Sequence, residues 1–253
     1  MKKLFIELES EPLYINYLDK GLDRLQNDSL SKDQKVNFVK DTMTTEAENA
    51  VRNVETKEGY IQTEKRMDKL VKFLTSESGA LKSIMDSSGY AMDGFQHCAN
   101  VATLSLSLAN ICGYNKPKEL LELGLAALLH DIGKAELGLD PHAYRENLIE
   151  EDKRKWDKHP DTGATMLADK PHISKSILEM IMYHEEKGDC IGPHKKKISV
   201  LPLGTQILSL CNEYDRIATV KQIPPKEVIK SFLQEKIGLF DLKHITALSG
   251  LLK

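Results

Sequence analysis

The segment from Glu119 to His130 constrains the fold more than any other part of the chain. Its residues, ELLELGLAALLH, are so rich in apolar side chains that a helix formed by them must be buried on most of its sides. Such a helix needs other elements packed around it. After residue 88 almost no segment alternates apolar and polar residues as a strand does. We therefore predict a mainly α fold, with an all-helical bundle as its main part.

Seven helical patterns can be drawn in this bundle region, and most of them have a proline or a glycine close to one end. They are Phe95–Ala109, Glu119–His130, Glu150–Lys158, Thr162–Ala168, Ser174–Glu185, Gly204–Ile217 and Lys226–Gln234.

Residues 1–88 have a different character and carry no recognisable chemistry. Leu4 to Leu8 form a short strand-like run. Ser31 and Gln34 have the spacing of a capping box and precede a long segment with apolar residues at helical spacing. We predict a small N-terminal mixed or helical domain over residues 1–88, with a regulatory or sensor role and a connecting helix, and a second domain over residues 89–253. The polar stretches 75–79 and 87–89 are the candidate boundaries.

Composition excludes several classes of protein. The chain has 253 residues, 41% apolar and 29% charged, which is typical of a globular protein with a full core. No stretch approaches the roughly 20 apolar residues of a membrane span, and the apolar run at the start is too short for a secretory signal, so we expect a cytoplasmic protein. A net charge of −3 gives no reason to expect nucleic-acid binding. The four cysteines lack CxxC spacing, so we expect free thiols.

The adjacent pair His130-Asp131 closes the most hydrophobic helix of the chain. An ionised aspartate at that position is costly unless it is paired with a cation or bound to one. Gly133 is expected to break the helix, and Lys134 follows within reach of the same point. The pair is therefore a candidate for chemistry as well as for structure.

Three further histidines, His97, His159 and His184, lie on or at the end of predicted helices. Any one of them alone would be interpreted as a core residue satisfied by one hydrogen bond. Together with His130 and Asp131, however, they supply imidazole nitrogens, which suit iron, manganese or zinc, and a carboxylate that can bridge two ions. A two-metal centre lowers the pKa of a bridging water and clamps a phosphate between its ions. We therefore predict hydrolysis of a phosphoester.

The motifs follow one another in a specific order. They are His97, then His130-Asp131-Ile132-Gly133-Lys134, His159-Pro160, Tyr183-His184-Glu185, Gly192-Pro193 and Asn212-Glu213-Tyr214-Asp215. This order resembles the HD-GYP family of the HD superfamily of metal-dependent phosphohydrolases, bacterial phosphodiesterases that open cyclic di-GMP. The resemblance runs from about residue 90 to 220 and implies an HD-type all-helical bundle.

The resemblance also implies a set of metal ligands. His97, His130 and Asp131 would hold one metal ion. Asp131 would bridge to a second ion, held by His159 and His184. The resemblance thus implies two divalent transition-metal ions, iron or manganese.

Further implications concern the reaction and its partners. Lys134 matches the family lysine that contacts the phosphate or helps to protonate the leaving oxygen, so Asp131 and Lys134 are the catalytic candidates. A cyclic dinucleotide or a related phosphoester is the implied substrate. Signalling proteins such as those with GGDEF-type domains are the implied protein partners.

The chain departs from the family at three motif positions. The first histidine of the family's HHE motif is Tyr183, and the Gly-Tyr-Pro that gives the family its name is Ile191-Gly192-Pro193, without the tyrosine. The aspartate that completes the first metal site is Asn212, a neutral and weaker oxygen ligand. The two losses among the metal ligands indicate weaker or altered metal binding, but not its absence, because five recognised ligands remain.

Other departures concern the phosphate contacts and a third metal. The family's later Arg and Lys, which grip the phosphates, fall at Lys221 and Pro224, so one positive charge remains. Asp93 occupies the place of a carboxylate that binds a third metal in some members, although a solvated aspartate at the start of a helix is an alternative interpretation. The basic run 194–197 could receive phosphate or could be a solvated charge run.

Three functional hypotheses remain open from the sequence. The first is a metal-dependent phosphodiesterase, which Asp131 and Lys134 favour. The second is a catalytically degenerate domain that binds metal and nucleotide and signals through protein partners, which Tyr183, Asn212 and the missing tyrosine favour. A structural helical scaffold without metal is the third, and it leaves the buried Asp131 unexplained.

Overall fold

A computed structural model describes residues 10–25, 30–77, 79–87, 94–140, 143–223 and 225–252. Within these ranges the chain is helical and contains no strand, which confirms the predicted mainly α fold. The strand-like run Leu4–Leu8 and the candidate boundary around residue 88 lie outside the described residues.

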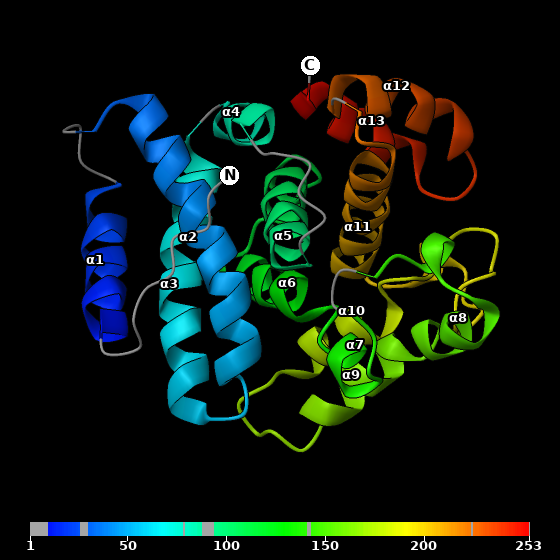
Figure 1. Cartoon of the computed structure of the whole chain (residues 1–253). Coiled ribbons are helices and arrows are strands. Elements are labelled where there is room, and N and C mark those ends of the chain that lie inside the picture. The colour runs from blue at the N-terminus through cyan, green and yellow to red at the C-terminus, as the bar shows by residue number, and fades with distance from the viewer. Residues whose placement is uncertain are drawn as a thin grey trace.

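The order of the elements is simple, and Figure 1 shows their arrangement. The helices are α1 (Glu11–Arg24), α2 (Lys32–Asn53), α3 (Lys57–Ser76), α4 (Ala80–Ser87), α5 (Gly94–Ile111), α6 (Pro117–Leu129), α7 (Gly133–Glu136), α8 (Glu150–Trp156), α9 (His159–Leu167), α10 (Lys175–Tyr183), α11 (Leu203–Lys221), α12 (Pro225–Glu235) and α13 (Leu242–Leu252). Short 3₁₀ turns, η2 (Arg145–Asn147) and η3 (Ile198–Val200), precede α8 and α11.

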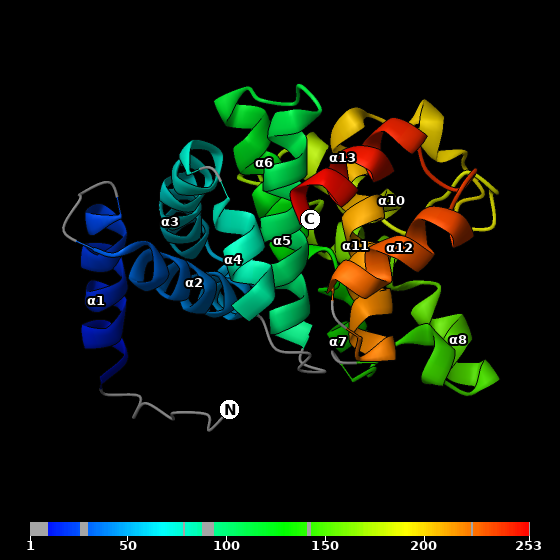
Figure 2. The ribbon, with the colours of Figure 1, turned by 90° about the horizontal axis from the view of Figure 1, so that it is seen from above.

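Helix α5 lies in the middle of the molecule, as the view from above in Figure 2 shows. Nearly all of its side chains from His97 to Ala109 are buried, on every side of the helix. It packs against α6 and α11, and on its other side against α2. Helix α6, the apolar segment that constrained the prediction, is buried from Leu123 to Leu129 between α5, α3 and α10. The two most apolar helices therefore form the centre around which the rest is arranged.

Helices α2 and α3 form a hairpin that packs on α5 and α6. Ser31 and Gln34 form the predicted capping box at the start of α2, with both reciprocal hydrogen bonds present. Val39 and Met43 of α2 and Leu70 of α3 are buried in the same apolar core as the residues of α5 and α6. One core thus continues through both sides of the predicted boundary near residue 88, and the separate role of residues 1–88 stays a prediction.

All seven predicted helices of the bundle region are present, with shifted ends. Two others, α7 and α13, have no counterpart among the predicted patterns. Helix α7 has only four residues, too few for a helical pattern to be recognised. Helix α13 has eleven residues, as many as the predicted α12, and was missed.

The predicted role of Gly133 is wrong. Helix α6 ends at Leu129, before the glycine, and Gly133 begins the short helix α7. A β-carbon on Gly133 would lie 2.2 Å from the carbonyl oxygen of His159 and 2.6 Å from the backbone nitrogen of Gly163. The glycine is needed because α7 and α9 approach each other closely, and this approach sets the position of His159.

Two bulk expectations can be compared with the described residues. The four cysteines are free, with Cys98 and Cys211 buried, as predicted. Among the described residues, no helix is both long enough and apolar enough to cross a membrane.

Candidate metal centre

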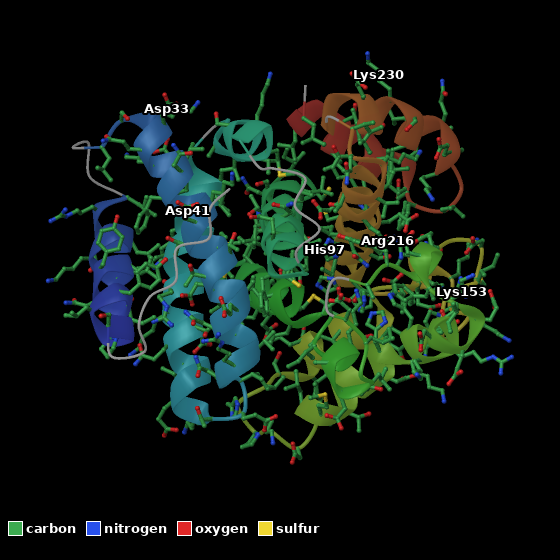
Figure 3. All side chains as sticks on the ribbon, viewed as in Figure 1. Asp33, Asp41, His97, Lys153, Arg216 and Lys230 are labelled. Atoms are coloured by element: carbon green, nitrogen blue, oxygen red, sulfur yellow. The ribbon has the colours of Figure 1, made fainter. Side chains whose placement is uncertain are left out.

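The structure brings the five predicted ligand residues together from separate helix ends. His97 comes from the first turn of α5, His130 and Asp131 from the turn that ends α6, His159 from the start of α9, and His184 from the end of α10. All four imidazoles are buried, and His130, His159 and His184 have no exposed surface. Figure 3 labels His97, on the central helix α5.

Three of the histidines are oriented by the free carbonyl groups at helix ends. The last carbonyls of a helix lack partners within the helix, so a side-chain donor can cap them. Nδ1 of His130 lies 2.8 Å from the carbonyl oxygen of Ala127 in α6. His184 makes the same contact with Ile181 in α10 at 2.6 Å. His159 makes it with Trp156, the last residue of α8, at 2.5 Å.

These contacts determine which ring nitrogen carries the proton. A carbonyl oxygen can only accept, so each Nδ1 carries the hydrogen and each Nε2 presents a lone pair, an assignment that follows from the partners. Nε2 of His159 then faces Nε2 of His184 at 3.0 Å and Oδ1 of Asp131 at 3.1 Å. Acceptors therefore face acceptors, an arrangement that repels unless a proton or a metal ion lies between them.

His97 is oriented by a carboxylate and not by a backbone carbonyl group, but its Nε2 again presents a lone pair. Its Nδ1 donates to Oδ2 of Asp215 at 2.7 Å, a carboxylate that orients the ring. Its Nε2 lies 3.0 Å from Oδ1 of Asn212. The amide of Asn212 is not reversed, because its Nδ2 donates to Oε1 of Glu185 at 2.9 Å. A second pair of acceptors thus converges on the other side of Asp131.

Asp131 lies between the two groups of histidines. Its Oδ2 accepts a hydrogen bond from Nζ of Lys134 at 2.6 Å and lies 3.5 Å from Nε2 of His130. Burial by itself raises the pKa of the Asp131 carboxyl, but Lys134, His130 and His159 together more than offset this and hold the pKa well below its usual value. Asp131 is therefore an anion, paired with one lysine at the centre of four imidazoles.

The donor set fits divalent metal ions. Ligand atoms of His97, His130 and Asp131 lie within 4.8 Å of one another, and so do those of Asp131, His159 and His184. Nε2 of His130 is buried without a hydrogen-bond partner among the described residues. Burial lowers the pKa of His130 to about 4 and that of His184 to about 3, which keeps both rings neutral and their lone pairs free. Neutral imidazoles and a carboxylate suit iron, manganese and similar ions.

The side chain at position 183 contacts a surface loop. The hydroxyl of Tyr183 accepts a hydrogen bond from Nζ of Lys196 at 2.8 Å, and its ring packs on His194 with ring centres 4.9 Å apart. The buried carboxylate of Glu186 fixes this loop by accepting from the backbone nitrogens of His194 and Lys196. Gly192 lies against Glu186, since a β-carbon there would approach its Oε1 to 2.5 Å.

The remaining predicted positions lie elsewhere. Lys221 is at the end of α11, and its Nζ pairs with the carboxylate of Glu235 on α12 at 3.5 Å. Asp93 lies outside the described residues. Lys195, Lys196 and Lys197 of the basic run are all exposed, as expected for a solvated charge run, and Lys195 also lines a pocket.

Sequence reasoning gave no role to three residues of the site. Asp215 orients His97, Glu185 accepts from Asn212, and Arg216 pairs with Glu185 and Glu213. The positive charge of Arg216 opposes the effect of burial and lowers the pKa of Glu185 to about 2. One signal was present: Asn212 and Asp215 are three residues apart, so they share one face of the predicted helix Gly204–Ile217.

A pocket of about 710 Å³ lies beside the centre. Its lining includes Trp156, Glu185 and Arg216, together with residues of η2, α8 and the loop between α10 and η3. The ring of Trp156 also packs against His159, with ring centres 4.6 Å apart. The pocket has the size of a small-molecule site, and its inner wall borders the candidate metal centre.

Comparison with known proteins decides the family. A family model described as HD domain matches residues 68–233, which is more than half of the chain. The chain belongs to the HD domain family. The match begins within α3, ahead of the predicted boundary near residue 88.

Two individual proteins narrow the relationship. The solved structure of Bd1817, an HDG"Y"P protein from Bdellovibrio bacteriovorus, is similar with a TM-score of 0.85 and 28% identity, over 97% of this chain and 81% of that one. A cyclic di-GMP phosphodiesterase of Pseudomonas aeruginosa, PA4108, is 30% identical over 130 residues. That match covers 50% of this chain and 31% of the relative, so it spans less than a third of the relative's length. The resemblance to the HD-GYP family is thereby confirmed.

Proposed function

We propose that this chain is a metal-dependent phosphodiesterase of the HD-GYP type, acting on cyclic di-GMP or a related phosphoester through a two-metal centre. The observation that carries the proposal is the shared position of Asp131. It belongs to both groups of potential ligands, with His97 and His130 on one side and His159 and His184 on the other. A carboxylate in that position suits a bridge between two ions.

Bound metal ions would supply an activated water and would neutralise negative charge on a phosphate. The residues of the chain supply the rest. The helix-end carbonyls and Asp215 hold the histidine rings in the orientation that ligation requires. The ammonium group of Lys134 lies 2.6 Å from Oδ2 of Asp131, a position that suits protonation of the leaving oxygen.

A second function is favoured by two observations of a different kind. Asn212 offers a neutral amide oxygen where a carboxylate would bind a cation more strongly, and Tyr183 contacts Lys196 on the surface loop. In this alternative the domain binds metal and nucleotide without turnover and signals through protein partners, such as proteins with GGDEF-type domains. Residues 1–88 would then receive or transmit the signal.

The test is an assay of metal-reconstituted protein with cyclic di-GMP, followed by chromatography for linear pGpG and GMP. The phosphodiesterase is expected to form a linear product, and the double variant Tyr183→His, Asn212→Asp should form it faster. Binding at micromolar levels by calorimetry, with no product over hours from either form, would support the binding module instead. Failure of both forms to bind or cleave would exclude cyclic di-GMP as the ligand.

A further inference from the structure

We propose that Arg216 binds a phosphate group of the substrate in the pocket beside the metal centre. The proposal rests on the proposed function and adds to it the residue that recognises the phosphate outside the metal ions. It follows from the position of the pocket, the charges that line it and the hydrogen bonds that Arg216 leaves unmade.

The pocket is joined to the centre by three residues that line it. Trp156 packs on His159, while Glu185 follows His184 in sequence and Arg216 follows Asp215. Each of these lining residues is thus next to a residue of the centre. A ligand that reaches the metal ions from this side would therefore place its remaining parts in the pocket.

The lining carries more positive than negative side chains, six against five. Arg145 is paired with Asp157 at 2.7 Å. Among the residues that the structure describes, Arg154, Lys158 and Lys195 make no ion pair, and all three are exposed. Glu146 and Asp189 of the lining are also exposed and make no ion pair in the described part of the chain, so the lining keeps an excess of one positive charge, which favours an anion.

Arg216 is a buried cation of the lining, and it is incompletely satisfied. Its side chain is only 7% exposed. One terminal nitrogen contacts Glu213, but the other lies 3.4 Å from Oε2 of Glu185, longer than the 2.7–2.9 Å of a strong charge-assisted bond. Its Nε is buried and has no hydrogen-bond partner among the described residues. A guanidinium with an unused donor and a long contact can take a phosphate without losing a strong bond.

The surroundings of Arg216 support this role. The guanidinium lies 5.6 Å from the ring centre of Trp156, and Nζ of Lys134 lies 5.7 Å from the same ring. Trp156 Nε1 is also buried without a hydrogen-bond partner in the described part of the chain. The two residues that carry these unused donors therefore line the same pocket, and phosphate oxygens are acceptors that suit both donors.

Lys221, the position that the family resemblance favoured for this role, is poorly placed for it. It lies five residues beyond Arg216 on α11, roughly 7.5 Å further along the axis at 1.5 Å per residue. Its ammonium group pairs with Glu235 at the surface. Arg216, one turn after Asn212, is the cation of α11 that borders the centre (Figure 3).

The experiment measures binding of inorganic phosphate and of GMP by calorimetry, with the full chain as purified and after metal reconstitution. Arg216→Lys keeps the charge but loses the forked geometry, and it should weaken GMP binding about tenfold, the loss expected for one charge-assisted hydrogen bond. Glu185→Gln removes the carboxylate that competes for Arg216 and should strengthen binding severalfold. Arg52→Lys, an exposed arginine of α2 paired with Glu48, is the matched control and should bind as the unmodified chain does.

Opposite effects of the two pocket variants would separate ligand binding from a structural role, since loss of folding cannot strengthen binding. Thermal unfolding of each variant identifies any that fail to fold. If Arg216→Lys does not fold, the affinity of Glu185→Gln for GMP tests the proposal. The proposal would be overturned if Arg216→Lys bound GMP as tightly as the unmodified chain, or if Lys221→Gln lost affinity for GMP instead. It would also be overturned if the unmodified chain bound neither phosphate nor GMP, with or without metal. Elemental analysis of the same samples tests the metal centre separately, so a failure of the proposed metal centre can be distinguished from a failure of phosphate binding by Arg216.

Discussion

Two buried polar clusters in this protein differ in how their hydrogen-bonding groups are paired. Between α2 and α3, Oε1 of Glu46 accepts hydrogen bonds from Nε of Arg66 at 2.7 Å and from Nδ2 of Asn49 at 3.1 Å. Donors meet acceptors, and the charges are opposite. In the candidate metal centre the lone pairs of His159 and His184 face each other at 3.0 Å, and both approach Asp131.

The difference shows how a structural cluster can be distinguished from a ligand site. Burial raises the pKa of Glu46 even beside Arg66, whereas Lys134, His130 and His159 together hold the pKa of Asp131 well below its usual value despite burial. In the first cluster Oε1 of Glu46 finds its donors within the fold, although Oε2 of the same carboxylate is buried without a hydrogen-bond partner among the described residues. The second cluster concentrates acceptors that face one another, an arrangement that suits a proton or a bound cation.

The largest effect is expected for Asp131→Ala. Loss of the proposed bridge should release both ions and remove the stabilisation that metal binding gives, about 4 kcal/mol at a free metal concentration a thousandfold above Kd. Chelation of the unmodified protein should lower the unfolding temperature in a similar way. Asp68→Ala, at an exposed aspartate paired with Lys72, is the control and should keep its metal. Full metal content in Asp131→Ala would show that the site is assigned wrongly.

A comparable change in the structural cluster should affect stability alone. Arg66→Met leaves the buried Glu46 without its cation, and breaking a buried ion pair in this way costs about 3 kcal/mol. Metal content, measured on the folded fraction, should equal that of the unmodified protein. If metal were lost with Arg66, the two clusters would be coupled and the contrast between them would fail.

The smallest effect concerns Asn212. Asn212→Asp adds a charged oxygen next to His97, which should tighten metal binding by about tenfold, on the order of 1.4 kcal/mol. In chelated protein the same change places a carboxylate 2.9 Å from Oε1 of Glu185 and should destabilise the fold. Adding Glu185→Gln should restore that stability. An unchanged metal affinity in both variants would mean that position 212 does not face an ion.

Much of the centre could be predicted because its residues are marked by position in the sequence. His130 and Asp131 end the most apolar helix, and His159 stands beside a proline between the predicted helices Glu150–Lys158 and Thr162–Ala168. Such helix ends can be recognised from local pattern, and their order carries the family resemblance. The all-helical fold followed from the same patterns.

The remaining site residues could not be predicted in the same way. Asp215 and Arg216 lie inside α11, where their roles depend on how that helix crosses α5 and on the loop that carries Glu185. The spacing of residues on one helix predicts that they share a face, but it does not predict which other helix packs against that face. Gly133 was misinterpreted for the same reason, because its close neighbour His159 lies 26 positions further along the chain.

The metal content of the protein, purified without chelator, tests the central claim most directly. Elemental analysis should find close to two equivalents of a transition metal per chain, iron or manganese, because two groups of acceptors converge on Asp131. Metal that stays well below one equivalent, even after reconstitution under reducing conditions, would contradict the claim. The facing lone pairs of His159 and His184 would then have to be held together by a proton instead.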